Sequence, residues 1–202
     1  MRRLAALAAA AAFATVCVST PGVAVARPLP SEATQKGLLL TSSQAKTASA
    51  YSGEIVTPFP AYCDVTQDGG RDCSLSFQPT TDDLLNNPQS YPFLVAISGF
   101  LTTAEAMDHW RQHVSSPQAY SGETIVIMTK TATQVTYVAI PANPAQMHWA
   151  YTTIRGRQGI LTAGCIANAT GPSHTLLAKC SADVAKAQAR AVKESRPRTP
   201  LG

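Results

Sequence analysis

The stretch that decides the fold is residues 123–168, ETIVIMTKTATQVTYVAIPANPAQMHWAYTTIRGRQGILTAGCIAN. It contains four runs rich in β-branched and aromatic residues, separated by short turns with glycine or polar residues. These runs predict strands over 123–129, 134–140, 147–154 and 159–168. Because consecutive strands joined by short turns pair antiparallel, the stretch predicts an antiparallel meander.

Upstream of the meander, the sequence predicts a buried strand followed by a helix. The apolar run from Phe93 to about Phe100 is the strand. Thr102 and Glu105 then form a capping box, in which the side chain of each residue accepts a hydrogen bond from the backbone N–H of the other. The core face of this helix is predicted from helical spacing, at Met107, Trp110 and Val114.

The N-terminal part predicts a further helix and two short strands. Thr41 and Gln44 form another capping box, which predicts a helix over about 42–51. Short strands are expected at 55–56 and 73–77, and one helical turn within 81–87.

The C-terminal part predicts one more strand and a last helix. After the turn at 170–173, residues 174–179 are predicted to be a strand, and Ser181 is predicted to cap the helix that follows. The order of elements favours an α+β fold: an antiparallel sheet of about five to seven strands with helices packed on one face.

The first twenty-six residues predict export. Arg2 and Arg3 precede an apolar run from Leu4 to Val18, and the segment ends in Ala24-Val25-Ala26, as a signal peptide does. We therefore expect a cleaved signal at 1–26, a flexible leader at 27–37, one globular domain at 38–194 and a disordered basic tail at 195–202. The mature protein is expected to be secreted or extracytoplasmic, with no integral membrane segment.

Charge and cysteine content narrow the function further. Loss of Arg2 and Arg3 lowers the formal charge from +4 to +2, so we expect no nucleic-acid partner.

The remaining cysteines, Cys63, Cys73, Cys165 and Cys180, form an even set, typical of disulfides in an oxidising compartment. Three connectivities are possible. The sequence favours Cys63–Cys73 and Cys165–Cys180, because each pair brackets a plausible turn.

One motif suggests an enzyme. Ser43-Gln44-Ala45-Lys46 matches the S-x-x-K pattern of penicillin-interacting serine enzymes, in which Lys helps to remove the Ser proton. The S-D-N element of those enzymes is missing, and the first turn of a capped helix explains Ser43 equally. A serine enzyme that uses Ser43 and Lys46 is kept as an alternative. The main prediction assigns no catalytic residues.

Two groups of residues are candidates for binding. Glu105, His109 and His113 share one helix face at a spacing that suits a metal, although a solvated helix face explains them too. We expect no metal or other cofactor. For a ligand, the candidate contacts are Trp110 and His113 on the helix, and Arg155 and Arg157 at a hairpin tip, where guanidinium groups suit a carboxylate or phosphate.

The C-terminal half carries a family resemblance. Gly164-Cys165, a strand, a turn, the segment 176–179, Cys180 and an Ala-rich helix resemble the end of the PknH-type sensor domain. That domain occurs outside the membrane on actinobacterial receptor kinases and alone in small secreted proteins. The resemblance spans most of 38–193. It implies an antiparallel sheet with helices, a cleft able to hold a small ligand, and no catalytic residues.

The sequence therefore predicts an exported, disulfide-stabilised, non-enzymatic binding or sensor-like module. Its ligand is expected to be a small or envelope-derived molecule, held in a cleft between sheet and helices. The first alternative is a secreted protein-interaction or inhibitor domain without a ligand pocket, whose partner is a protein. The second is the cell-envelope serine enzyme described above.

Overall fold

The computed structural model describes residues 30–48, 55–56, 59–65, 70–80, 93–99, 103–119, 122–143, 145–157, 159–167 and 173–194. The predicted signal at 1–26, the predicted helical turn at 81–87 and the predicted tail at 195–202 lie outside these residues. In chain order the elements are α1 (Glu32–Lys36), α2 (Ser42–Ala48), β1 (Ile55–Val56), β2 (Tyr62–Val65), β3 (Arg71–Pro79), β4 (Phe93–Gly99), α4 (Thr103–His109), η1 (Trp110–Val114), β5 (Glu123–Lys130), β6 (Gln134–Pro141), β7 (His148–Arg155), β8 (Gly159–Ala167) and α5 (His174–Glu194).

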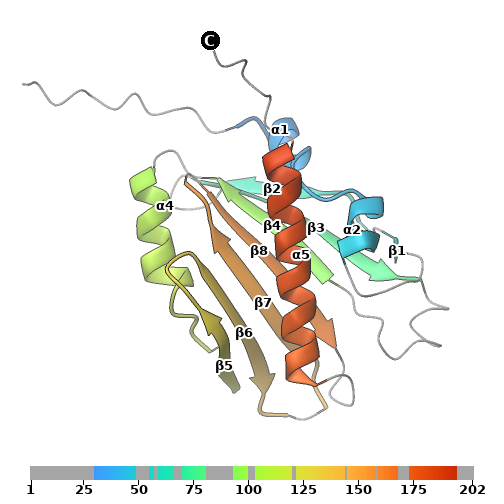
Figure 1. Cartoon of the computed structure of the whole chain (residues 1–202), viewed down its shortest axis with the longest axis vertical. Helices are drawn as coiled ribbons and strands as arrows, with labels where there is room; N and C mark the ends of the chain where they lie inside the picture. The colour runs from blue at the N-terminus through green and yellow to red at the C-terminus, as the bar shows by residue number, and fades with distance from the viewer. Residues whose placement is uncertain are drawn as a thin grey trace, which may run out of the picture.

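The strands form one antiparallel sheet of eight strands within the described residues, in the order β1-β3-β4-β8-β7-β6-β5, with β2 also paired to β3 (Figure 1). The predicted α+β class with an antiparallel sheet is thus confirmed. The strand number exceeds the predicted range by one, because residues 62–65 pair with β3 as a short strand that the sequence pattern did not reveal.

The predicted meander is confirmed. Strands β5 to β8 begin and end within one residue of the predicted bounds. Local turns fix their register: the Thr131 N–H donates to the Gln134 carbonyl at 2.8 Å, and the Gly156 N–H donates to the Gly159 carbonyl at 2.8 Å. Strand β4 then inserts between β3 and β8, with Ile97 paired to Cys73 on one side and Leu161 on the other.

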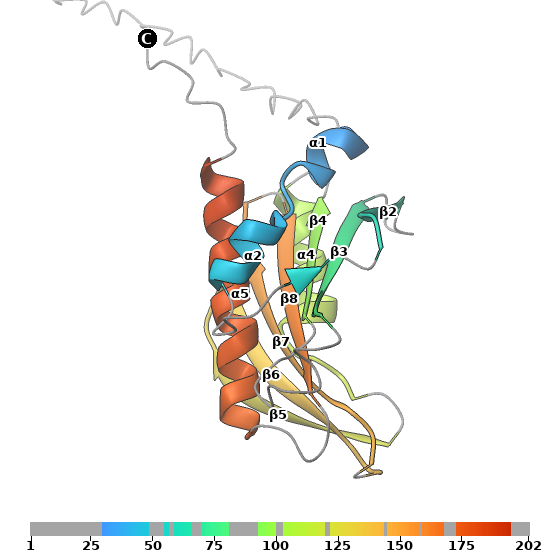
Figure 2. The same cartoon turned by 90° about the vertical axis from the view of Figure 1, so that its right-hand side faces the viewer.

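Helix α5 runs along one face of the sheet (Figure 2), where it packs on β7 and β8. Its start corrects the sequence analysis: residues 174–179 are not a strand but the first turns of α5. Ser173 begins the helix, because its hydroxyl accepts the Leu176 N–H at 3.4 Å and its carbonyl accepts the Leu177 N–H at 3.1 Å. Ser181, predicted as a cap, is instead buried inside the helix and donates to the Ala178 carbonyl at 3.0 Å.

The helices occupy both faces of the sheet. Alternate residues of a strand point to opposite faces, and the two hydrophobic clusters divide accordingly. Leu161 of β8 packs in the cluster that contains α5 and α2, whereas Ile160 packs against Trp110 of η1. The prediction that helices pack on one face therefore holds for α2 and α5, but α4 and η1 lie on the opposite face.

Part of the N-terminal leader is helical. Residues 32–36 of the expected flexible leader form α1, capped by the Ser31 hydroxyl, which accepts the Thr34 N–H at 3.2 Å. Gln35 is buried and donates to the Arg71 carbonyl at 2.7 Å. A polar side chain at this position gave no sign of burial in the sequence, because its partner lies on a distant strand.

The capping box of α2 is confirmed. The Gln44 N–H donates to the Thr41 hydroxyl at 3.3 Å, and the Thr41 N–H donates to the Gln44 side-chain carbonyl at 2.9 Å. The segment just before it is fastened to α5 by the buried Gln188. This side chain accepts the Leu40 N–H at 3.0 Å and donates to the Leu38 carbonyl at 2.5 Å.

Both predicted disulfides are present. Cys63–Cys73 joins the facing strands β2 and β3, and Cys165–Cys180 ties β8 to α5. In the described part of the chain, no helix combines the length and the apolar character needed to cross a bilayer.

Candidate functional site

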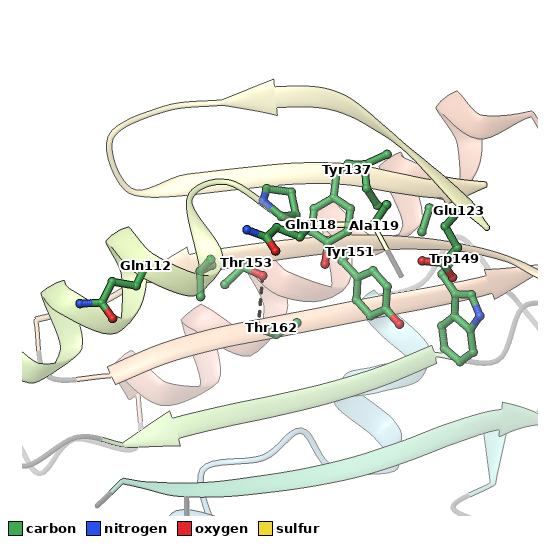
Figure 3. A pocket seen from close by; sticks show the side chains of 13 residues that line it. Gln112, Gln118, Ala119, Glu123, Tyr137, Trp149, Tyr151, Thr153 and Thr162 are labelled. Atoms are coloured by element: carbon green, nitrogen blue, oxygen red, sulfur yellow. Dashed lines mark hydrogen bonds between the residues drawn. The ribbon is translucent and has the colours of Figure 1, made fainter. Parts of the chain in front are cut away.

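The sheet face opposite α5 carries a cleft of about 970 Å³ (Figure 3). Strands β5 to β8 form its floor. The turn η1 and the loop that follows it, residues 115–119, form one wall. The cleft lies beside the small hydrophobic cluster that Trp110 forms with Ile160, so a packed core supports one end of the floor.

The floor carries three aromatic rings from two neighbouring strands, Tyr137 on β6 and Trp149 and Tyr151 on β7. Tyr137 and Tyr151 are register partners, with ring centroids 5.3 Å apart and planes tilted by 30°. Trp149 and Tyr151 are two residues apart on β7, so both point to the cleft side of the sheet, and their rings are nearly parallel at 5° with centroids 5.9 Å apart. All three side chains are half-buried, and Figure 3 shows them together on the floor of the cleft.

Small residues lie opposite two of these rings in the sheet. Ala139 is the register partner of Trp149, and Gly164 is the register partner of Tyr151. A Cβ atom at position 164 would lie 2.9 Å from Cε1 of Tyr151, closer than such contacts allow. The Tyr151 ring therefore lies against the bare backbone of β8, in the space that a side chain at position 164 would fill.

The groups around the aromatic floor are mainly neutral and polar. Gln112 comes from η1 and Gln118 from the loop, and the hydroxyls of Thr153 and Thr162 share a hydrogen bond of 3.2 Å at one end of the floor (Figure 3). Glu123 is the one charged side chain among the described residues that line the cleft. The arrangement offers ring faces, amides and hydroxyls to a bound molecule.

The wall of the cleft contains a π-helical turn. In η1 the Ser115 N–H donates to the Trp110 carbonyl, five residues back, at 2.7 Å. This wider turn keeps Trp110 buried in the core while Gln112 and Val114 line the cleft. Such turns occur often at functional sites, because the extra residue redirects neighbouring side chains.

The ligand contacts expected from the sequence lie elsewhere. Trp110 is only 4% exposed and packs in the core. Arg155 is half-buried, and its Nη1 donates to the Met107 sulfur at 2.9 Å. Arg157 is exposed at the hairpin tip. None of these three residues lines the cleft, and the side chain of His113 lies outside the described part of the structure.

The metal and serine-enzyme candidates gain no site from the geometry. Glu105 and His109 are both half-buried on α4. Across the described ranges, no three His, Cys, Asp or Glu side chains gather as a metal site would require. Ser43 is exposed in the first turn of α2, and its hydroxyl oxygen lies 3.2 Å from that of Thr41. A serine-enzyme activity stays a prediction.

A histidine pair that the sequence did not bring together lies at the end of the sheet. His148 begins β7 and His174 begins α5, and His148 Nδ1 lies 3.0 Å from His174 Nε2. One ring must donate its N–H to the other. Burial, and after it the charge of His174, lower the pKa of His148 below its ordinary value of 6.5. The neutral form of His148 is therefore favoured in the folded protein.

The aromatic floor is the feature that sequence reasoning missed, although a signal for it existed. Tyr137 on one predicted strand and Trp149, Tyr151 and Thr153 on the next share the period-2 spacing of a single sheet face. Adjacent strands of a meander place such rows side by side.

These features define an α+β domain with an antiparallel sheet, two disulfides and an open cleft on one face of the sheet. No protein-family model matches the chain, and no curated protein matches it in sequence. Among solved structures, the chain is similar to the extracellular domain of PknH from Mycobacterium tuberculosis, with 11% identity and a TM-score of 0.47, covering 81% of this chain and 98% of that domain. Because identity and TM-score are both low, membership of that family stays a prediction.

Proposed function

We propose that this protein is an exported, non-enzymatic binding module that holds a small or envelope-derived ligand in the aromatic cleft. The observation that carries the proposal is the row of half-buried rings, Tyr137, Trp149 and Tyr151, on the floor of a hollow of about 970 Å³. Ligand sites in proteins typically combine a concave shape of this order of size with aromatic surface and a few polar groups.

The two disulfides support export. Cys63–Cys73 and Cys165–Cys180 would be reduced in most cytosolic settings, whereas they persist outside the cytoplasmic membrane. The charged start, apolar run and small residues of the first twenty-six positions agree with that compartment.

The chemistry of the cleft supports binding rather than catalysis. Its ring faces, the amides of Gln112 and Gln118 and the hydroxyls of Thr153 and Thr162 are groups that recognise a ligand through packing and hydrogen bonds.

Native mass spectrometry of the protein purified from its own host tests this proposal. We expect a discrete extra mass on the wild-type protein that disappears on denaturation. In Trp149→Ala the extra mass should be lost, because the substitution removes a ring from the floor. The matched control is Phe59→Ala, which removes an aromatic ring that is 71% exposed and does not line the cleft.

A second pair of substitutions tests the site expected from sequence. Arg155→Ala with Arg157→Ala should leave the extra mass in place if the cleft is the site. Loss of the mass in this variant, with retention in Trp149→Ala, would move the site to the hairpin tip. If the wild-type protein shows only the mass of its own chain, the proposal is contradicted and a protein partner is favoured.

A further inference from the structure

We propose that the ligand of the cleft is a neutral saccharide whose sugar rings lie on Trp149 and Tyr151. The inference rests on the proposed binding function and adds the chemical class of the ligand. It is argued from the shape of the floor, the polar groups around it and the charge of its lining.

The floor presents the kind of surface that a sugar ring covers. The rings of Trp149 and Tyr151 are parallel within 5° and their centroids are 5.9 Å apart. Figure 3 shows the two rings side by side on the floor of the cleft. One face of a pyranose ring consists largely of C–H bonds, whose hydrogens carry partial positive charge. The face of an aromatic ring is negative, so the two faces attract each other as well as excluding water.

The position of Tyr151 is fixed independently of any ligand. Its ring lies against the backbone of Gly164, where no side chain intervenes, and its centroid lies 5.3 Å from that of the Tyr137 ring. A flat surface that is already in place loses little conformational entropy when a ligand binds. The floor is therefore suited to a rigid, flat-faced ligand.

The polar groups around the rings match sugar hydroxyls. A hydroxyl both donates and accepts hydrogen bonds, and so do the amides of Gln112 and Gln118 and the hydroxyl of Thr153. The Thr153 hydroxyl lies 3.2 Å from that of Thr162, and both residues line the cleft. An acyl chain would cover these groups without replacing the hydrogen bonds that water gives them.

The charge of the lining disfavours an anionic ligand. Among the described residues that line the cleft, Glu123 carries the one charge, and it is negative. No described lining residue offers a phosphate or sulfate a cationic group, and the Glu123 carboxylate beside it raises the cost of removing such an anion from water. A carboxylate is instead a good acceptor for sugar hydroxyls.

Tryptophan fluorescence gives a direct test, because the chain has two tryptophans and Trp110 is buried. In a Trp110→Phe background, Trp149 becomes the single reporter. The neutral probes are cellohexaose, maltohexaose, N-acetylchitohexaose and the neutral polysaccharide fraction of the host's own envelope. Decanoate, glucose 1-phosphate and an alanine tripeptide represent the other ligand classes. We expect a saturable change with a neutral saccharide.

Calorimetric titration of otherwise wild-type protein provides a second readout that does not need Trp110→Phe to fold. Trp149→Ala and Tyr151→Ala should each raise Kd about tenfold or more, as loss of a central aromatic contact does. Tyr151→Phe keeps the ring face and should bind nearly as the wild type does. Phe59→Ala should also retain affinity. Thermal melting of each variant confirms that it is folded.

The outcomes separate this inference from the proposed function. Trp149-dependent binding of a neutral saccharide supports both. Trp149-dependent binding of decanoate, the phosphorylated sugar or the peptide, with no neutral saccharide bound, overturns the saccharide and keeps the binding module. Absence of Trp149-dependent binding to every probe overturns the saccharide. If native mass spectrometry of the host protein also shows a bare mass, the binding function fails with it.

Discussion

The Tyr151 ring rests directly on Gly164 of the neighbouring strand, so that a Cβ atom at position 164 would lie 2.9 Å from Cε1 and 3.1 Å from Cδ1 of the ring. Strands β7 and β8 pair these two residues in register. The absence of a side chain at position 164 thus lets the Tyr151 ring lie against the backbone of β8. It also makes the cleft sensitive to a single methyl group.

Gly164→Ala is expected to destabilise the protein by about 1–3 kcal/mol, because the added methyl group forces the Tyr151 ring to move in a packed sheet. Urea unfolding measures the change. Tyr151→Ala in the same chain should recover part of the loss, since it removes the clashing ring. Gly37→Ala is the control, because a Cβ atom there meets its nearest neighbours at 3.4 Å. Equal losses in the presence and absence of the Tyr151 ring would contradict the contact.

Loss of the disulfide between β8 and α5 is expected to cost more than an ordinary surface change. Replacing Cys165 and Cys180 together by Ala should lower the free energy of unfolding by about 2–4 kcal/mol, mainly because the unfolded chain gains freedom. The cysteines are 15 residues apart in sequence. Denaturant unfolding under oxidising conditions measures the loss, with the reduced wild type as a second reference. An unchanged midpoint would show that packing of α5 alone holds the helix in place.

Thr152→Val is expected to destabilise the core by about 1–3 kcal/mol. The Thr152 hydroxyl lies at the centre of a buried chain, 2.9 Å from the hydroxyl of Thr136 and 2.9 Å from that of Ser181 on α5. The substitution keeps the shape but removes one buried hydrogen bond from each neighbour, while Ser181 keeps its bond to the Ala178 carbonyl.

Thr162→Val provides the matched control for this prediction. Thr162 bonds Thr153 on the cleft face and is half-buried, so water can replace the lost bond there. Its substitution should cost clearly less in the same unfolding experiment. Similar costs for the two variants would show that burial of the hydroxyl chain has little energetic weight.

The histidine pair predicts a pH dependence with a definite sign. Because burial and His174 lower the pKa of His148 in the folded state, the unfolded chain takes up this proton first as pH falls. The contribution of His148 is therefore fully present above pH 6.5, its ordinary pKa, and is lost as pH falls from there through the lowered value.

His174→Gln should weaken that dependence, because it removes the neighbouring charge that adds to the effect of burial. Urea midpoints of the wild type and the variant, compared on either side of pH 6.5, measure the difference. NMR titration of the His148 ring reports its pKa directly. A wild-type His148 pKa at or above the ordinary value would contradict the prediction, as would an equal pH dependence in both proteins.

Much of the sheet could be predicted from sequence because its signals are local. Period-2 runs separated by short turns define β5 to β8, and the turn at 155–159 fixes the register of the last two. The strand predicted at 174–179 is wrong for a local reason too. A short run such as Leu176-Leu177-Ala178 suits a strand or a buried helix equally, and only packing against β7 and β8 decides between them.

The candidate site was predictable only in part. The rows of Tyr137 and Trp149 lie on strands whose adjacency follows from the meander, so the floor was within reach of sequence reasoning. The wall was not. The placement of Gln112 depends on a π-helical turn and the burial of Trp110 depends on Ile160, which is fifty residues away along the chain. Helical spacing alone could not tell a ligand contact from a core residue.

The Gln188 side chain forms hydrogen bonds with the backbone of Leu38, 150 residues away in sequence, and of Leu40, 148 residues away. A polypeptide emerges from the ribosome with its N-terminus first, so these leucines wait for the last helix before their backbone groups find this partner. Closing so long a loop is slow, since its entropy must be lost before the contact forms. The final step of maturation is then expected to be the docking of the earliest-made segment, and a chain cut short before residue 188 would present Leu39 and Leu40 to chaperones or proteases.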